Sequence, residues 1–291
     1  FTMISMLTGS IINVILDPIM IYGLNWGIEG AAIATVISLC VSMLLYIGYI
    51  ASKQGVLRFS FRKITFSGKI YWEILKIGIP VLLFQLLSSL SMSLTNNAAK
   101  PYGDYAVAAM GAVTRIMTVG TYVVFGFLKG FQPFAGYNYG AKQFDRLRKA
   151  IKLCMIWSTV FGVVAAIILI VFAEPMVSLF GTDSEMVALA SKALRLNAVL
   201  FITFGFQMVY ATLYLAIGKS VVGGLLSLSR QGIFFIPLIY VLPRLWELNG
   251  LVCVQPMADL LTTIVTVIFA IRITRSLSAS RKDNILNTEV I

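Results

Sequence analysis

Apolar runs long enough to cross a lipid bilayer recur along almost the whole chain and restrict its fold more than any other feature. A membrane-spanning helix needs about 20 consecutive apolar residues. The chain is 59% hydrophobic and only 12% charged, and its runs are continuous rather than alternating as barrel strands would be. The sequence therefore predicts an all-α polytopic membrane protein without a sizeable soluble domain. We expect eight transmembrane helices, at 1–23, 29–51, 72–97, 104–131, 149–173, 193–217, 223–243 and 250–273.

The basic residues gather in alternate loops. Of 23 lysines and arginines, fifteen fall in the loops on one side and in the tail, and the opposite loops and their margins carry four. This is the positive-inside pattern. It places the polar connector 52–71, the loop 136–149 and the polar tail 276–291 in the cytoplasm, and we expect the tail to be disordered. The amphipathic segment 174–192 is expected to lie at the membrane interface.

Several chemistries are disfavoured by what the sequence lacks. It has no histidine, and its three cysteines, Cys40, Cys154 and Cys253, all fall within expected spans. No disulfide framework, transition-metal site or catalytic triad is therefore indicated. We find no phosphate-binding loop. We expect a protein that is not an enzyme, carries no cofactor and binds no nucleic acid, with the lipid bilayer and small molecules as its partners.

Asp17 is one of two acidic residues that lie well inside expected spans, where a carboxylate is costly unless it faces a cavity or a partner. Asn13 lies four residues earlier and so shares its helix face. Thr35 is expected at a similar depth on the next helix, about 9 Å from the outer end at a rise of about 1.5 Å per residue. The three residues can converge on one polar site for a proton or Na⁺. Alternatively, Asp17 only caps the helix end beside Pro18.

Asp259 is the second such carboxylate. Its expected depth, about 13 Å from the outer side, is close to the 16 Å or so expected for Arg115. An ion pair between these two residues would lower the cost of burying both charges. The pair could serve as a second protonation site, but a structural bridge between two helices is favoured.

The inner helix ends supply further candidates. Lys129 and Gln132 lie near the cytoplasmic end of the fourth span, which Pro133 is expected to kink or end. The next residues, 136–140, read Gly-Tyr-Asn-Tyr-Gly and predict a tight turn, which could also act as an inner gate. Arg230 and Gln231 could line an inner vestibule, with helix packing as an equal alternative.

Two segments resemble the multidrug and toxic-compound extrusion (MATE) transporters. The first is Asn-Val-Ile-Leu-Asp-Pro-Ile at 13–19, followed by Gly-Ile-Glu-Gly-Ala-Ala-Ile-Ala-Thr at 27–35. The second, which is the more specific, is Gly-Phe-Gln-Pro-Phe-Ala-Gly-Tyr-Asn-Tyr-Gly-Ala-Lys at 130–142. Shorter matches at 216–219, 229–231 and 256–259 follow in family order.

The resemblance implies a two-lobe architecture of twelve helices. Residues 1–51 would be the last two helices of the N-lobe, 52–71 the connector and 72–275 the six-helix C-lobe, so that the eight spans correspond to helices five to twelve. The echo of Trp26-x3-Gly30 in Trp246-x3-Gly250 independently suggests a six-helix repeat. We therefore expect a fragment that lacks about four N-terminal helices and is inactive by itself.

The function that the resemblance implies is secondary active export of drugs or toxic metabolites. A proton or sodium gradient would drive antiport of amphiphilic, often cationic, molecules across the bacterial cytoplasmic membrane, with the full-length protein acting as a monomer. In related transporters an Asn, an Asp and a Thr placed like Asn13, Asp17 and Thr35 line a cation or proton site, whose other carboxylate lies on a helix that this sequence does not contain. Candidate substrate contacts in the C-lobe are Gln85, Met92, Asn96, Met117, Gln207, Met208 and Tyr210, although such methionines more often pack than bind ligands.

One departure from the family bears on the coupling ion. Some members carry sodium-site carboxylates on the helices that correspond to 72–97 and 193–217. Here the nearby positions are Ser88, Met208 and Val209. This argues against a C-lobe sodium site of that type.

Two other functions remain open. A lipid-linked saccharide flippase of the same superfamily would line its cavity with several Arg or Lys, whereas only Arg115 is clearly expected at depth. A non-transport receptor or scaffold would be expected to carry large loops or an appended signalling domain.

Overall fold

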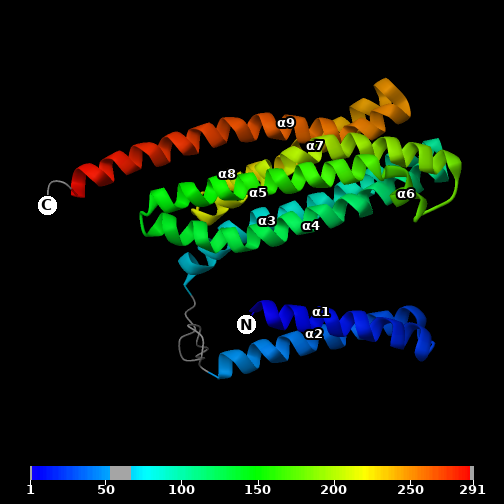
Figure 1. Cartoon of the computed structure of the whole chain (residues 1–291), viewed down its shortest axis with the longest axis horizontal. Helices are drawn as coiled ribbons and strands as arrows, with labels where there is room; N and C mark the ends of the chain where they lie inside the picture. The colour runs from blue at the N-terminus through cyan, green and yellow to red at the C-terminus, as the bar shows by residue number, and fades with distance from the viewer. Residues whose placement is uncertain (1, 53–66, 289–291) are drawn as a thin grey trace. The chain divides into compact units, whose positions relative to one another are not determined.

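The computed structural model describes the backbone of residues 2–52 and 67–288 and the side chains of residues 3–52 and 67–276. Within these ranges the chain is helical almost throughout (Figure 1). The short elements are α6 (Ala173–Ser178), α8 (Ser220–Leu228), the 3-10 turn η3 (Lys100–Tyr102) and the π-helical turns η1 (Ile19–Gly23) and η4 (Ser229–Ile233). The long helices are α1 (Thr2–Pro18), α2 (Gly27–Ala51), α3 (Gly68–Ala99), α4 (Asp104–Gly140), α5 (Phe144–Val171), α7 (Ser184–Ala216) and α9 (Phe235–Thr288).

The predicted all-α membrane class is confirmed. Seven segments of the described chain are long and apolar enough to cross a bilayer. The last of them, Ser220–Ser276, has 57 residues, or about 85 Å at a rise of about 1.5 Å per residue, which is too long for one crossing. Its helix breaks at Trp246 and Glu247, whose backbone angles are not helical. This segment therefore accommodates the last two of the eight predicted spans.

The chain divides into two compact units, residues 1–67 and 68–291. In the first unit, α1 and α2 pack against each other along their lengths. The close approach depends on glycine, because a Cβ at Gly9 would meet the side chain of Ser42 and a Cβ at Gly30 would meet the backbone of Met20. Ser42 Oγ also donates a hydrogen bond to the carbonyl oxygen of Ser5, at 3.3 Å. Small residues thus hold this helix pair together, as they do in many membrane helix pairs.

The second unit is a bundle built around α7. This helix packs against α4, α5, α6, α8 and α9, and Figure 1 shows it running between its neighbours. It is buried on all sides over much of its length, as an apolar helix at the centre of a bundle should be. Phe201, Phe204 and Leu213 are among its fully buried side chains. The central position of α7 lets its polar residues reach α9.

The prediction of a tight turn at 136–140 is wrong. Helix α4 continues through Pro133 to Gly140, so residues 136–140 are its last turns and the tight turn comes only at Lys142, where φ is 55°. The proline ring removes one helical hydrogen bond but does not end this helix. The segment 174–192 contains most of α6, a short connection and the beginning of α7, which starts at Ser184, and its location at the membrane interface stays a prediction.

The predicted connector and tail also need correction. The connector 52–71 falls mainly on residues 53–66, which lie outside the described residues, and α3 already begins at Gly68. The tail was expected to be disordered from residue 276, whereas α9 continues to Thr288. Residues 289–291 lie outside the described residues.

Candidate functional site

Asp17 lies in the next-to-last position of α1, directly before Pro18 and the π-helical turn η1. Its side chain is partly buried. Asn13 donates a long hydrogen bond of 3.4 Å from Nδ2 to Asp17 Oδ1. This is the single polar partner that the described residues offer the Asp17 carboxylate, so most of its acceptor capacity is free for a proton or a cation.

Thr35 does not join this contact. Its side chain is exposed, and its hydroxyl donates to the carbonyl oxygen of Ala31 on its own helix, at 2.9 Å. The structure therefore brings together two of the three residues predicted for the Asp17 site. Among the described residues, no group of three or more His, Cys, Asp and Glu could hold a metal ion. A sodium ion at Asp17 would thus need carbonyl, hydroxyl or amide oxygens as its other ligands.

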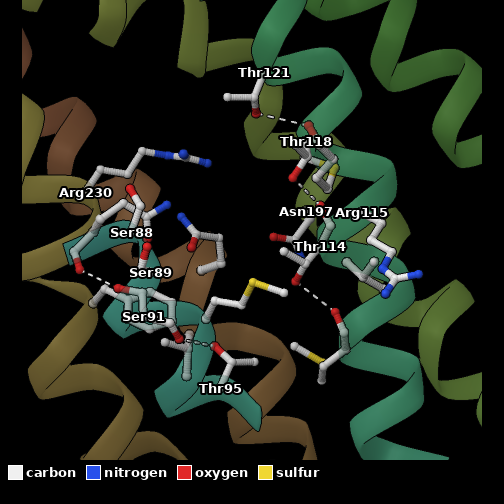
Figure 2. A pocket seen from close by; sticks show the side chains of 18 of the residues that line it. Ser88, Ser89, Ser91, Thr95, Thr114, Arg115, Thr118, Thr121, Asn197 and Arg230 are labelled. Carbon is white, nitrogen blue, oxygen red and sulfur yellow. Dashed lines mark hydrogen bonds between the residues drawn. The ribbon is translucent and has the colours of Figure 1, made fainter. Parts of the chain in front are cut away.

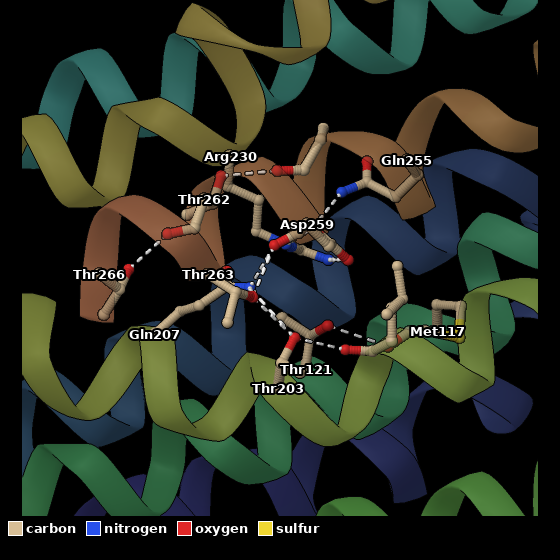
Figure 3. Close-up of polar contacts among 12 residues, drawn as sticks. Met117, Thr121, Thr203, Gln207, Arg230, Gln255, Asp259, Thr262, Thr263 and Thr266 are labelled. Carbon is tan, nitrogen blue, oxygen red and sulfur yellow. Dashed lines mark hydrogen bonds and ion pairs between the residues drawn. The ribbon is translucent and has the colours of Figure 1, made fainter. Parts of the chain in front are cut away.

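Asp259 has a very different environment in the second unit, shown in Figure 3. It is 2% exposed, and Arg230, which is 7% exposed, pairs with it. Arg230 donates from Nε to Asp259 Oδ1 at 2.6 Å and from Nη2 to Oδ2 at 3.3 Å. Gln255 Nε2 donates to the same Oδ1 at 2.9 Å. A bidentate ion pair with an additional amide donor offsets much of the free-energy cost of burying the two charges.

Gln207 of α7 supports this pair from the other side of α9. Its Nε2 donates to the main-chain oxygen of Asp259 and to Thr263 Oγ1, both at 2.9 Å. Thr263 Oγ1 in turn donates to the Asp259 main-chain oxygen at 2.7 Å. Gln207 is 1% exposed and its Oε1 has no partner. Gln207 was predicted as a substrate contact, but its buried amide is hydrogen-bonded to α9.

Arg230 owes its position to the π-helical turn η4. Ser91 of α3 donates from Oγ to the main-chain oxygen of Gln231 at 2.6 Å, so one carbonyl of this irregular turn has a partner from another helix. The guanidinium carbon of Arg230 lies 4.6 Å from the ring centroid of Phe204, a distance at which the ring face attracts a cation. π-Helical turns often occur at functional sites, and this one presents an arginine to the interior of the bundle.

The predicted ion pair between Asp259 and Arg115 is wrong. Asp259 pairs with Arg230, while Arg115 is exposed on α4 and makes no hydrogen bond or ion pair with any described residue. Arg115 and Asp259 were paired because their expected depths are similar. Depth does not say which way a side chain faces around its helix, and Asp259 faces Arg230 instead. Arg230 had been predicted to line a vestibule instead.

A cavity of about 550 Å³ opens between α3, α4 and the α8–α9 segment of the second unit. In Figure 2 the labelled serines and Thr95 of α3 lie on one side of it and the labelled threonines of α4 on the other. Arg230 approaches from the first side, and Arg115 stands at the α4 edge. The volume is in the range of small-molecule sites. Its lining is mixed, with Phe84, Met92, Met110, Val113, Met117, Phe125, Phe235 and Ile239 beside Ser88, Ser91, Thr95, Thr114, Thr118, Thr121, Asn197 and Gln255.

The residues predicted to contact substrate separate into two groups. Gln85, Met92 and Met117 line the cavity, as do Gln231 and Arg230. Four others do not: Asn96 lies outside the lining, Gln207 is hydrogen-bonded to α9, and Met208 and Tyr210 are buried in the apolar core around Phe204. A methionine or tyrosine at helical spacing therefore packs here more often than it lines a cavity.

The hydroxyl residues of the cavity were missed. Thr114, Thr118 and Thr121 recur at helical spacing along one face of α4, and Ser88, Ser91 and Thr95 do the same on α3. Two stripes of hydroxyls on consecutive spans could have been recognised in the sequence. The last two predicted gate residues lie elsewhere, since Lys129 is exposed and Gln132 half-buried near the end of α4, and neither lines this cavity.

The fold and this cavity define a polytopic helical membrane protein with a cavity of small-molecule size inside a helix bundle. Comparison with known proteins gives its family. The MatE family model matches residues 79–241, more than half of the chain, and the chain belongs to this family.

Individual relatives agree with this assignment. The multidrug export protein MepA of Staphylococcus haemolyticus is 30% identical over 86% of this chain, and that of Staphylococcus saprophyticus 27% identical over the same share. A solved outward-facing multidrug resistance MATE family transporter of the MOP superfamily superposes with a TM-score of 0.86 over 96% of this chain, at 24% identity. The chain spans 55% of the length of the two MepA proteins and 63% of that structure.

Proposed function

We propose that the protein is a secondary active exporter that moves amphiphilic small molecules out of a bacterial cell. The observation that carries this proposal is the cavity of about 550 Å³ in the second unit, which combines aromatic and methionine side chains with hydroxyl groups. Apolar, flexible lining suits chemically varied ligands. The names of the staphylococcal relatives as multidrug export proteins support the same activity.

Asp17 is the proposed coupling residue. Its carboxylate has one long contact to Asn13 among the described residues, so binding of a proton or Na⁺ would change its charge without breaking an established ion pair. Such an ion drives alternating access only if it binds the inward- and outward-facing states with different affinity. Asn13 would orient the carboxylate. Thr35 would take part only if its hydroxyl turned away from Ala31, to which it donates in this structure.

Asp259 and Arg230 have a structural role in this proposal. Both charges are buried and satisfied by each other, by Gln255 and by the ring of Phe204. Removing the charge of Asp259 would leave an unpaired guanidinium in the bundle, which is strongly unfavourable. We therefore assign the pair to holding η4 and α9 together, at the wall of the cavity.

The proposed location is the bacterial cytoplasmic membrane, with the C-terminus in the cytoplasm. The asymmetric distribution of lysine and arginine between alternate loops supports this orientation. A reporter fused after Ile291 that is active only in the cytoplasm should give a signal. A reporter active only outside the membrane should stay silent.

Dye efflux tests the export activity. The full-length protein that contains this sequence should lower dye accumulation in a bacterial host stripped of its own efflux pumps, and a protonophore should abolish the effect. If Na⁺ is the coupling ion, replacing it with K⁺ should also abolish the effect. Thr118→Trp fills the cavity and should remove efflux, whereas Val119→Trp, on an exposed part of the same helix, is the matched control. Equal accumulation with and without the full-length protein contradicts the proposal.

A further inference from the structure

We propose that the cavity of the second unit selects amphiphiles that carry an acidic group over organic cations, and that Arg115 determines this selectivity. The inference rests on the proposed function, because it assigns a ligand class to the same cavity. It concerns the charge of the preferred ligand, which the apolar and hydroxyl side chains of the lining do not determine.

The charges around the cavity are all of one sign. Among the described residues that line it, two carry a charge at neutral pH, and these are Arg115 and Arg230. None of those lining residues is a carboxylate. The described lining therefore offers an organic cation no carboxylate.

Asp259 does not supply the missing negative charge. It lies behind Arg230, is 2% exposed, and already accepts from Arg230 and from Gln255. The pair therefore presents its positive member to the cavity and keeps its negative member away from it. A cation entering the cavity would meet the guanidinium before the carboxylate.

Arg115 differs from Arg230 because its charge is not neutralised by any described residue. It is exposed on α4 and is one of the residues that line the cavity, at the α4 edge (Figure 2). A guanidinium can hold a carboxylate or sulfonate with two parallel hydrogen bonds. Arg115 is thus a ready anchor for an acidic group.

The hydroxyls add a second requirement. Thr114, Thr118 and Thr121 each donate their hydroxyl hydrogen to a backbone oxygen of α4, at 2.7–3.0 Å. These hydroxyls can then offer lone pairs to a ligand, but no hydrogen. A ligand that matches the cavity would carry an N–H or O–H donor for them as well as an acidic group for Arg115. The hydroxyl acceptors alone would also suit an ammonium group. The charge of the arginines therefore determines whether an acidic or a cationic ligand is preferred.

The size of the charge effect can be estimated. At about 10 Å and an effective dielectric constant of about 20, one unit charge changes the affinity of a charged ligand by roughly tenfold. The effect has opposite signs for an anion and a cation. The rings of Phe84, Phe125 and Phe235 could attract a cation, but they also bind the apolar body of an anion, so they oppose the charge effect only in part.

Three dansyl compounds with the same fluorophore test the inference on the purified 291-residue chain in neutral detergent. Dansylglycine is an anion, its methyl ester is neutral, and dansylcadaverine is a cation. Dansyl fluorescence rises in apolar sites and gives each dissociation constant. We expect dansylglycine to bind about tenfold tighter than the ester and the ester about tenfold tighter than dansylcadaverine, a difference of up to about a hundredfold between the two charged compounds.

Substitutions assign the preference to one residue. Arg115→Gln should weaken dansylglycine binding by about tenfold and leave the ester unchanged, while Arg115→Lys should keep most of the preference. Arg195→Gln is the matched control, since this exposed arginine of α7 pairs with Glu174 at 3.5 Å and does not line the cavity. A short-chain phosphatidylglycerol that displaces dansylglycine, where phosphatidylcholine does not, would identify an anionic lipid as the source of the acidic group. Absence of such displacement points to a small soluble amphiphile.

Three results overturn the inference, and they differ in what they say of the proposed function. If dansylcadaverine binds more tightly than dansylglycine, or if Arg115→Gln leaves dansylglycine binding unchanged, the charge assignment is wrong while the cavity remains a ligand site. If none of the three compounds binds, both the inference and the proposed role of the cavity fail.

Discussion

Asp17 and Asp259 are both carboxylates in apolar helices, and the structure gives them opposite surroundings. Asp259 is buried, paired with Arg230 through two hydrogen bonds and held further by Gln255. Asp17 is only partly buried and accepts one long hydrogen bond from Asn13. The difference teaches that a membrane carboxylate is a functional candidate only when its partners leave its charge available. Where the partners are complete, the charge has a structural role.

The largest effect on stability is expected at the buried pair. Asp259→Asn removes the negative charge and leaves Arg230 unpaired in the bundle, which should lower the free energy of unfolding by about 3–5 kcal/mol. Thermal unfolding in detergent measures the change. Glu174→Gln, which breaks an exposed ion pair with Arg195, is the control and should cost less than about 1 kcal/mol. Equal losses in the two variants would show that the buried pair is no more important than a surface pair.

A smaller loss is expected for Gln255→Leu. The amide of Gln255 donates to Asp259 Oδ1 at 2.9 Å, while Arg230 continues to neutralise the carboxylate. Loss of one hydrogen bond to a charged group should lower the free energy of unfolding by about 1.5–3 kcal/mol. A loss as large as that of Asp259→Asn would mean that Gln255, and not Arg230, is the principal partner of Asp259.

Replacing both members of the pair separates the charge from the packing. The double variant Arg230→Met/Asp259→Leu leaves no buried charge, so its stability should stay within about 1 kcal/mol of the wild-type protein or exceed it. The same unfolding measurement applies. A double variant as unstable as Asp259→Asn would indicate that hydrogen bonds of the pair to other groups, rather than charge balance, stabilise this region.

The smallest effect is expected in the first unit. Asn13→Ala removes a hydrogen bond of 3.4 Å at a partly buried site, which is near the limit of hydrogen-bonding distance. The free energy of unfolding should change by no more than about 0.5 kcal/mol. A loss above about 1.5 kcal/mol would show that Asp17 is held as firmly as Asp259, and the contrast between the two sites would disappear.

The fold class could be predicted from the sequence because the length of the apolar runs determines it. Eight hydrocarbon-length runs leave few alternatives to a helical membrane bundle, and even the break at Trp246 and Glu247 was marked by the short gap between two runs. Helix ends were less certain. A proline such as Pro133 can remain inside a membrane helix where neighbouring groups take over the hydrogen bonds that it frees, so its presence did not end α4.

The site could be predicted only in part. Depth and spacing along the sequence do not show how each helix is rotated about its own axis relative to its neighbours. Asn13 and Asp17 lie four residues apart on one helix, and this contact was predicted correctly. Arg115 and Asp259 lie on different helices, and their similar depth did not make them partners. The true partner, Arg230, is presented by the π-helical turn η4, whose extra residue shifts the faces of the helix. No regular spacing in the sequence predicts such a turn.

Gradient-driven efflux by Asp17→Asn, measured together with its unfolding temperature, tests the central claim most directly. An imposed proton or sodium gradient across vesicles that contain the full-length protein should drive dye export by the wild type. We predict that Asp17→Asn loses this export while its unfolding temperature stays at the wild-type value, since Asp17 has no ion pair to break among the described residues. Export at the wild-type rate by Asp17→Asn, or a loss of export that accompanies unfolding, would contradict the account.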